Sequence, residues 1–161
     1  MGLPDVSTVL WRERELLELL LFKLEEEQLL LAAGKSKWLP FATREVEQVL
    51  GRLRTAGMER TVESAVLAAE WGLQDHATLR ELVAAAPSPA WRDIFSSHLT
   101  ALTGLTAQVA EIRDTNLTFL RAAARSTQES LANLNPDAGV YDGRGAPAMA
   151  AGGAHFFDRR F

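Results

Sequence analysis

The sequence contains no cysteine, which excludes disulfide bonds, thiolate metal sites and cysteine nucleophiles together. This composition suits a reducing compartment, so we expect a cytoplasmic protein. A long apolar run is also missing. The most apolar stretch, residues 16–24, is interrupted by Glu18 and Lys23 and is far shorter than the roughly 20 residues that span a bilayer. With no basic region ahead of an apolar core at the N-terminus, we expect neither a secretory signal nor membrane insertion.

An excess of positive charge is absent too. The 17 Lys and Arg residues against 21 Asp and Glu give a formal net charge of −4. Such a chain has no overall attraction for phosphate backbones, so we expect no nucleic acid partner.

Residue patterns that carry catalysis or bind metals are missing as well. A carboxylate-bridged metal site in a helical bundle needs Glu-x-x-His pairs, but Leu73, Phe95 and Gly152 stand three residues before the three histidines. The segment 34–36 reads Gly-Lys-Ser, yet it lacks the first glycine of a phosphate-binding loop. The sequence therefore predicts no catalytic residue, no cofactor and no metal ligand, and we expect a protein that is not an enzyme.

What the sequence has is helical periodicity, whereas no stretch alternates with period two. From about Ser7 to Ala33 the residues are strong helix formers, and leucines recur every seven positions. Ser7 or Thr8 is the expected N-cap, and Gly34 occupies the place of a left-handed C-terminal cap. The pattern predicts a long amphipathic helix.

A second helix is expected after the linker of residues 34–42, with Thr43 as its N-cap. It continues to Trp71, Gly57 being the point where it would bend, and Gly72 ends it. We expect Asp75 to cap a short third helix that the turn at residues 87–89 closes.

The start of the last helix has the clearest signal, because Ser88 is a natural N-cap and Pro89 fits the first helical position. This helix runs to about Leu134. Its apolar residues repeat by sevens in two rows that predict a coiled-coil seam: Phe95, Leu102, Val109, Asn116 and Ala123 in the first, and Leu105, Ile112 and Phe119 in the second.

These elements predict an all-α fold, a long antiparallel helical hairpin or coiled-coil bundle of three long helices plus one short connecting helix. We expect residues 1–134 to form this bundle. Beyond it the composition changes to Asp, Gly, Ala and Pro, so residues 135–161 are expected to be a flexible tail, which ends in an aromatic cluster with His155, Phe156, Phe157 and Phe161.

Several segments resemble actinobacterial proteins of the FlgN type. The resemblance lies in residues 10–28, which begin Leu-Trp-Arg-Glu-Arg-Glu, and in residues 33–35, 38–40 and 42–46. It continues in Asn116, Leu117, Phe119 and Leu120, where that family has an asparagine followed by leucines, and in residues 141–145, Tyr-Asp-Gly-Arg-Gly, which are similar to its tail motif. Together these segments span most of the chain.

The resemblance implies a cytoplasmic chaperone without ATP hydrolysis. Such a chaperone binds the C-terminal helical segments of hook-filament junction proteins, keeps them unassembled and delivers them to the flagellar type III export gate. A helical client with an exposed apolar stripe needs a matching stripe to cover it, which a long helical hairpin supplies. Helical hairpins that expose such a stripe often dimerise, so a homodimer is an alternative that the sequence leaves open.

In the family, the client surface is associated with the later part of the last long helix. The resemblance therefore implies that the partner-binding residues are Leu105, Val109, Ile112, Asn116, Phe119, Leu120 and, in the tail, Tyr141.

Each of these residues has an alternative interpretation. The apolar ones can instead face the first helix, and Asn116 can fix the register of a buried seam rather than bind an incoming backbone. Tyr141 can be a lone aromatic residue in a linker. For the whole protein, the alternatives are a generic coiled-coil adaptor without an export role and an enzyme whose site is assembled from scattered polar residues.

Overall fold

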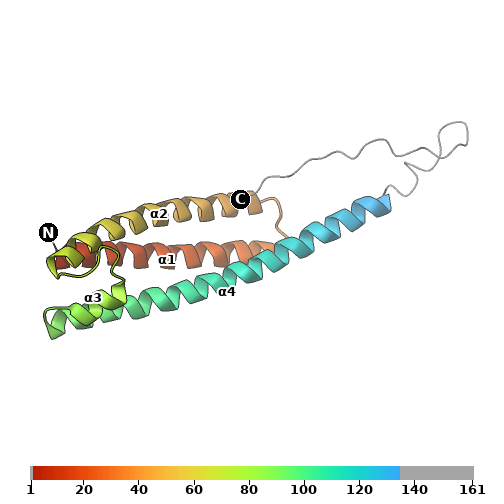
Figure 1. Ribbon diagram of the computed structural model, residues 1–161. Helices are drawn as coiled ribbons and strands as arrows, with labels where there is room; N and C mark the ends of the chain where they lie inside the picture. Colours follow the sequence, from red (N-terminus) through yellow and green to blue (C-terminus); the bar gives the residue numbers. More distant parts are fainter. Residues whose placement is uncertain (1, 135–161) are drawn as a thin grey trace, which may run out of the picture. The chain divides into compact units, whose positions relative to one another are not determined.

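The computed structural model describes residues 2–134, and these residues contain four helices and no strand. The helices are α1 (Leu3–Ala32), α2 (Leu39–Glu70), α3 (Leu79–Ala85) and α4 (Pro89–Leu134) (Figure 1). The all-α prediction, with three long helices and one short connecting helix, is confirmed. The predicted tail, residues 135–161, lies outside the described residues, and the boundary at residue 134 stays a prediction.

The chain divides into two units, Met1–Leu120 and Arg121–Phe161. The first unit contains α1, α2, α3 and α4 as far as Leu120. Of the second unit, the structure describes Arg121–Leu134, the helical end of α4. The packing described below belongs to the first unit.

In the first unit, α1 and α2 run antiparallel with their backbones close together (Figure 1). The helix α4 contacts them through side chains, among them Phe95, Val109 and Ile112. The short helix α3 lies between the end of α2 and the start of α4. Because α4 is held off by side chains, its spacing from α1 and α2 depends on how large those side chains are.

The start of α1 differs from the prediction. The helix begins at Leu3, four residues before Ser7, with Pro4 in its first turn, where the ring fixes a helical φ. The backbone N–H of Gly2 donates to a carboxylate oxygen of Asp5 at 2.8 Å. The capping group is therefore an acid inside the first turn rather than a hydroxyl before it, and the hydroxyl of Thr8 donates to the carbonyl of Pro4 within the helix.

Two further starts were misplaced by the sequence reasoning. α2 begins at Leu39 instead of after Thr43, again with a proline, Pro40, in its first turn. α3 is capped by Thr78, not Asp75: the Glu81 N–H donates to Thr78 Oγ1 at 3.3 Å, and the Thr78 N–H donates to the Glu81 carboxylate at 2.6 Å. The backbone N–H and the hydroxyl of Thr78 both donate to the Glu81 carboxylate, and these two hydrogen bonds lower the pKa of Glu81.

The predicted helix ends agree better with the structure. Gly34 and Gly72 have φ angles of 64° and 67°, a left-handed conformation that glycine adopts without a steric penalty. α2 continues without a break through Gly57. α4 begins at Pro89, as predicted, and its described part runs to Leu134.

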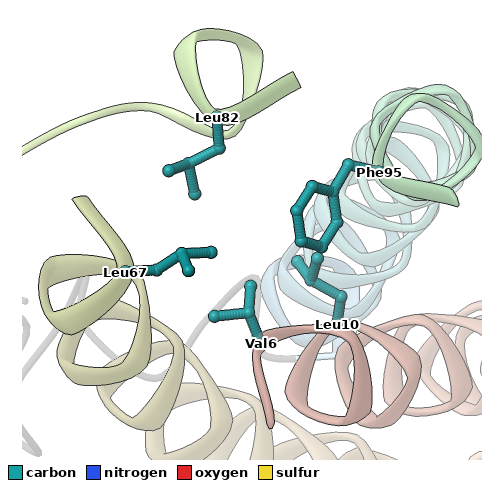
Figure 2. Packing of buried hydrophobic residues seen from close by; sticks show 5 residues of the cluster. All are labelled: Val6, Leu10, Leu67, Leu82 and Phe95. Atoms are coloured by element: carbon teal, nitrogen blue, oxygen red, sulfur yellow. The ribbon is translucent and has the colours of Figure 1, made fainter. Parts of the chain in front are cut away.

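The most completely buried cluster joins all four helices. It consists of Val6 and Leu10 from α1, Leu67 from α2, Leu82 from α3 and Phe95 from α4 (Figure 2). Trp71 and Trp91 lie against Phe95, with ring centroids 6.5 and 5.8 Å from it. A second cluster, formed by Leu20, Leu24, Val46 and Val49, lies farther along α1 and α2.

Replacing Phe95 with alanine is expected to lower the free energy of unfolding by about 3–5 kcal/mol, because the ring is fully buried at the point where the four helices meet. Phe22→Ala is the matched control, since the ring of Phe22 is 54% exposed and its loss should cost under about 1 kcal/mol. Urea titration followed by circular dichroism measures both changes. Equal losses would contradict the assignment of the core to this end of the unit.

Candidate functional site

The predicted partner-binding residues of α4 do not all have the same environment. Val109 and Ile112 are partly buried and contact the second cluster, which contains Leu24 of α1 and Val46 of α2. Leu105 is half-buried on the same face of α4. In the structure, this face therefore covers α1 and α2.

Asn116 is the most buried residue of the set, with 2% of its surface exposed. Its Nδ2 donates to the backbone carbonyl of Leu24 in α1 at 2.9 Å. Its Oδ1 is buried and has no hydrogen-bond partner among the described residues. Burying an amide with an unpaired oxygen costs free energy of folding. Its remaining hydrogen bond forms in this register of α4 on α1 and would be lost if α4 shifted along α1.

Glu27 lies close to this amide and is itself buried. Burial raises the pKa of its carboxyl, while the polar groups of Asn116 and Thr43 act in the opposite direction. Thr43 belongs to α2 and Asn116 to α4, so polar groups from three helices meet around one carboxyl.

The next residues along α4 are more open. Leu120 is half-buried, whereas Phe119 and Leu117 are 41% and 40% exposed. These two are large apolar side chains that the described part of the chain does not cover. Tyr141, the last predicted contact residue, lies outside the described residues.

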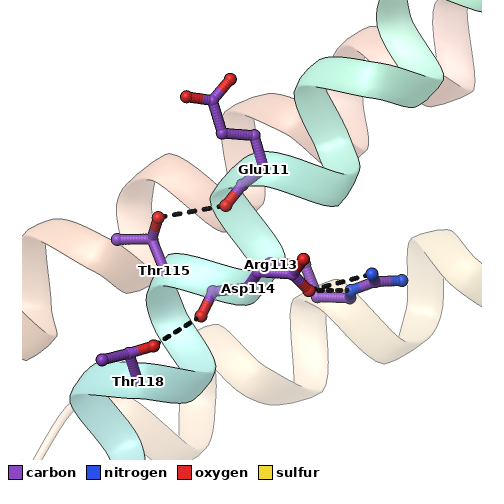
Figure 3. Close-up of polar contacts among 5 residues, drawn as sticks. All are labelled: Glu111, Arg113, Asp114, Thr115 and Thr118. Atoms are coloured by element: carbon purple, nitrogen blue, oxygen red, sulfur yellow. Dashed lines mark hydrogen bonds and ion pairs between the residues drawn. The ribbon is translucent and has the colours of Figure 1, made fainter.

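The outer face of α4 in this region is polar. The hydroxyls of Thr115 and Thr118 donate to the backbone carbonyls of Glu111 and Asp114, at 3.1 and 3.0 Å (Figure 3). Arg113 pairs with the neighbouring Asp114 at 2.9 Å. The exposed apolar residues thus lie beside a solvated face of the same helix.

Sequence reasoning missed a second buried carboxyl, that of Glu13 in α1. Its Oε2 lies 2.9 Å from Nε of Arg60 in α2. The backbone of Gly57 in α2 is close as well, since a Cβ atom added there would lie 3.6 Å from Oε1, at van der Waals contact. Burial raises the pKa of Glu13, and Arg60 opposes this shift. The seven-residue spacing in the sequence could have indicated that this carboxyl is buried. One row of α1 consists of Val6, Glu13, Leu20 and Glu27, and all four are buried.

His98 of α4 is buried against the start of α1. Its Nε2 is 3.2 Å from Oγ of Ser7, and its ring stands edge-on to Trp11 with centroids 5.1 Å apart. Burial lowers the pKa of His98, and the positive charge of Arg14 lowers it further. The environment is that of a packed, neutral histidine.

Among residues 2–134 the structure brings together no group of three or more histidine, aspartate or glutamate side chains suited to a metal ion. In the same range, no helix combines the length and hydropathy needed to cross a bilayer. What the site offers is an apolar face with buried polar groups.

Long helices with an apolar face are common to many proteins, so the comparison with known families decides the identification. The family model described as FlgN protein matches residues 1–148. The chain belongs to the FlgN family. No curated protein and no solved structure matches it. FlgN proteins are chaperones of flagellar assembly that serve type III export, and this role applies to the chain in general terms. The resemblance found in the sequence is thereby confirmed.

Replacement of Glu27 with glutamine is expected to raise the melting temperature at pH 7. Because the folded pKa of Glu27 is raised, its contribution to stability is fully present below its ordinary pKa of 4.5 and is lost as pH rises through the folded value. Glutamine removes this charge but keeps polar atoms at the position.

Melting curves of the two proteins between pH 4.5 and 7.5 measure the difference. The melting temperature of Glu27→Gln should exceed that of the unchanged protein by an amount that grows as pH rises across this range. The control Glu18→Gln changes an exposed residue and should have the melting temperature of the unchanged protein at every pH. A constant offset between the Glu27→Gln and unchanged proteins would contradict the role of the buried charge.

Proposed function

We propose that this FlgN-family chain is a cytoplasmic chaperone for hook-filament junction proteins. It binds their C-terminal helical segments, prevents premature assembly and delivers them to the flagellar export gate. It acts by binding and not by catalysis. Family membership supports a role in export, and the identity of the client and of the gate contact comes from the resemblance described above.

One observation carries the proposal. The apolar rows of α4 continue past the packed residues Val109 and Ile112 to Phe119, whose large side chain stays 41% exposed. Exposed apolar side chains in line with a packed row are typical of protein-binding surfaces. A client helix with its own apolar stripe would cover this surface, as an amphipathic helix covers a hydrophobic groove.

The predicted contact residues differ in what they can offer a client. Phe119 is open, and Leu120 and Leu105 are half-buried, so we propose these three as direct contacts. Val109, Ile112 and Asn116 already contact α1 or α2, and we propose that they support the surface from beneath. Tyr141 is proposed as an additional contact to the client or to the export gate.

The first test is isothermal titration calorimetry of the intact protein against a peptide from the C-terminal helix of a hook-filament junction protein of the same organism. Binding at micromolar concentration or tighter, with a negative heat-capacity change, is expected because apolar surface is buried. A peptide of the same composition in scrambled order is the control. No binding by the folded protein would favour a coiled-coil adaptor without an export role.

Changing Phe119 and Leu120 together to alanine should weaken binding of this peptide at least about tenfold, since large apolar contacts dominate such interfaces. The melting temperature should change little, because Phe119 is open and Leu120 only half-buried. Phe22→Ala, which removes a similarly exposed ring from α1, should leave the affinity unchanged. Parallel loss of stability and affinity in the double variant would indicate that the two residues belong to the core.

A further inference from the structure

A hollow of about 270 Å³ lies between α1 and α4, and no residue of α2 lines it. Its apolar lining comes from Leu21 and Ile112, which are partly buried, and its carboxylates come from Glu25 and Glu111, which are exposed. The hollow therefore has an apolar base and two acidic side chains near its opening to solvent.

The hollow and Phe119 lie on one face of α4. Gln108, Ile112 and Thr115 line the hollow, and Phe119 follows Thr115 by four residues. Residues at these spacings of three and four share one side of a helix. The exposed ring that is proposed above as a client contact therefore continues the α4 side of this hollow.

The register of α1 and α4 places Phe119 at one end of the hollow. Hydrogen bonds join Ser7 to His98 and Asn116 to Leu24, and the paired residues are 91 and 92 positions apart in the sequence. The two helices therefore run parallel. The same separation brings Phe119 to the level of residues 27–28 of α1, and Gln28 lines the hollow.

The two carboxylates of the hollow have no cationic partner among residues 2–134. Neither Glu25 nor Glu111 forms a salt bridge in this range, and no lysine or arginine lines the hollow. In Figure 3 the carboxylate of Glu111 extends away from the backbone of α4 and contacts none of the other residues drawn. The cations nearest in the sequence are already paired, Lys23 with two glutamates and Arg113 with Asp114.

The hollows beside α2 differ in this respect. In one of them Glu13 pairs with Arg60, and in another Glu59 pairs with Arg12. Each of these carboxylates is thus neutralised by an arginine of the same hollow. Only a cation from another molecule can do the same for Glu25 and Glu111 with the described residues in this arrangement.

A lysine or arginine side chain has the chemistry that this hollow would recognise. Two carboxylates at one hollow repel each other, and a cation between them is attracted by both. The aliphatic stem of such a side chain can cover apolar surface while its charged end stays close to solvent. Leu21 and Ile112 offer the apolar surface, and Glu25 and Glu111 offer the negative charge.

We propose that the client helix lies along the flank of α4 beside α1 and inserts a lysine or arginine into this hollow. The stem of the basic side chain covers Leu21 and Ile112, and its charged end lies between Glu25 and Glu111. A large apolar side chain of the same helix packs on Phe119. This inference rests on the proposed function, and it identifies the client segments as amphipathic helices with a basic residue beside the apolar stripe.

The geometry of α4 also fixes the spacing within the client. Ile112 and Phe119 are seven residues apart, which is about 10 Å along a helix axis. The basic residue and the apolar residue of the client helix should therefore lie about two turns apart.

Reversing the charge of the hollow tests the proposal. Glu25→Lys combined with Glu111→Lys should weaken binding of the client peptide at least about tenfold at low salt, and less at high salt, because like charges then face each other. The melting temperature should change little, since both residues are exposed. Glu15→Lys combined with Glu47→Lys is the matched control, because these exposed glutamates do not line the hollow and the net charge changes equally.

Exchanging the charges provides a test that a change in folding cannot imitate. A peptide whose basic residue two turns from its apolar anchor is changed to glutamate should bind the unchanged protein more weakly. The variant with lysines at 25 and 111 should bind this acidic peptide more tightly than it binds the original peptide. If no basic-to-acidic change in the peptide is rescued in this way, the proposal is wrong.

Cross-linking locates the client directly. A photoreactive benzoylphenylalanine in place of Gln108 should cross-link to the peptide, whereas the same group in place of Ala107 should not, because Ala107 lines the hollow between α2 and α4. Cross-links from position 107 alone would place the client on the other flank of α4. Cross-links from position 108 to a second copy of the chain, or within the chain, instead of to the peptide would also overturn the proposal.

The outcomes separate this inference from the proposed function. If the unchanged protein binds the peptide and the variant with lysines at 25 and 111 binds it equally well, the chaperone function stands and this hollow is not the client site. If the control variant loses as much affinity, the overall charge of the protein is responsible and the inference is wrong. If the unchanged protein does not bind, the proposed function and this inference fail together.

A milder variant covers the case in which the two lysines lower the melting temperature. Glu25→Gln combined with Glu111→Gln removes both charges but keeps the size of the side chains. It should still weaken binding at low salt, and the difference from the unchanged protein should shrink as salt is added. Equal affinity of the glutamine variant and the unchanged protein at low salt would contradict the proposal.

Discussion

The contact of α1 with both α2 and α4 is the constraint on which the rest of the first unit depends. α1 is close to α2 along its backbone, but it meets α4 through side chains, which include the hydrogen bond between Ser7 and His98 and the one from Asn116 to the carbonyl of Leu24. An apolar contact made by Val109 and Ile112 tolerates sliding, whereas a buried amide tolerates it poorly. Asn116 therefore fixes where along α1 the later, more open residues of α4 are presented.

The buried carboxyls of α1 follow from the same constraint. Glu13 and Glu27 lie in one row with Val6 and Leu20, and each meets a polar group from a neighbouring helix. Burying a carboxylate opposes folding unless it is paired, and the raised pKa values of both residues express that opposition. Replacing a buried ion pair such as Glu13 with Arg60 by apolar residues is often stabilising, so these carboxyls do not account for the stability of the unit.

Much of this arrangement could be predicted from the sequence. The number of helices, the ends at Gly34 and Gly72 and the start of α4 at Pro89 follow from local chemistry, because glycine with positive φ and proline in the first turn act within a few residues. The starts of α1 and α2 were missed because hydroxyl residues inside the helices imitate caps, while Pro4 and Pro40 mark the true first turns.

The environment of the α4 face could not be predicted in the same way. Heptad spacing identifies Val109, Ile112 and Asn116 as one row, but it does not say whether that row covers α1 or awaits a partner. The answer depends on how α1, α2 and α4 pack together, since Val109 and Ile112 contact a cluster that draws residues from both α1 and α2. Such packing involves three helices at once, so no single segment of sequence encodes it.

The sizes of the side chains along α4 determine where this helix is closely packed and where it leaves space. Near the start of the helix, Phe95 fills the space between four helices. Around Ala107 small residues leave a hollow, and the contact resumes with Val109 and Ile112. A larger apolar residue at 107 would fill part of this hollow and would gain about 25 cal/mol for each Å² of apolar surface that it buries. Stability alone would favour a larger residue at this position, so the packing of α4 on α1 and α2 does not account for the small residues there.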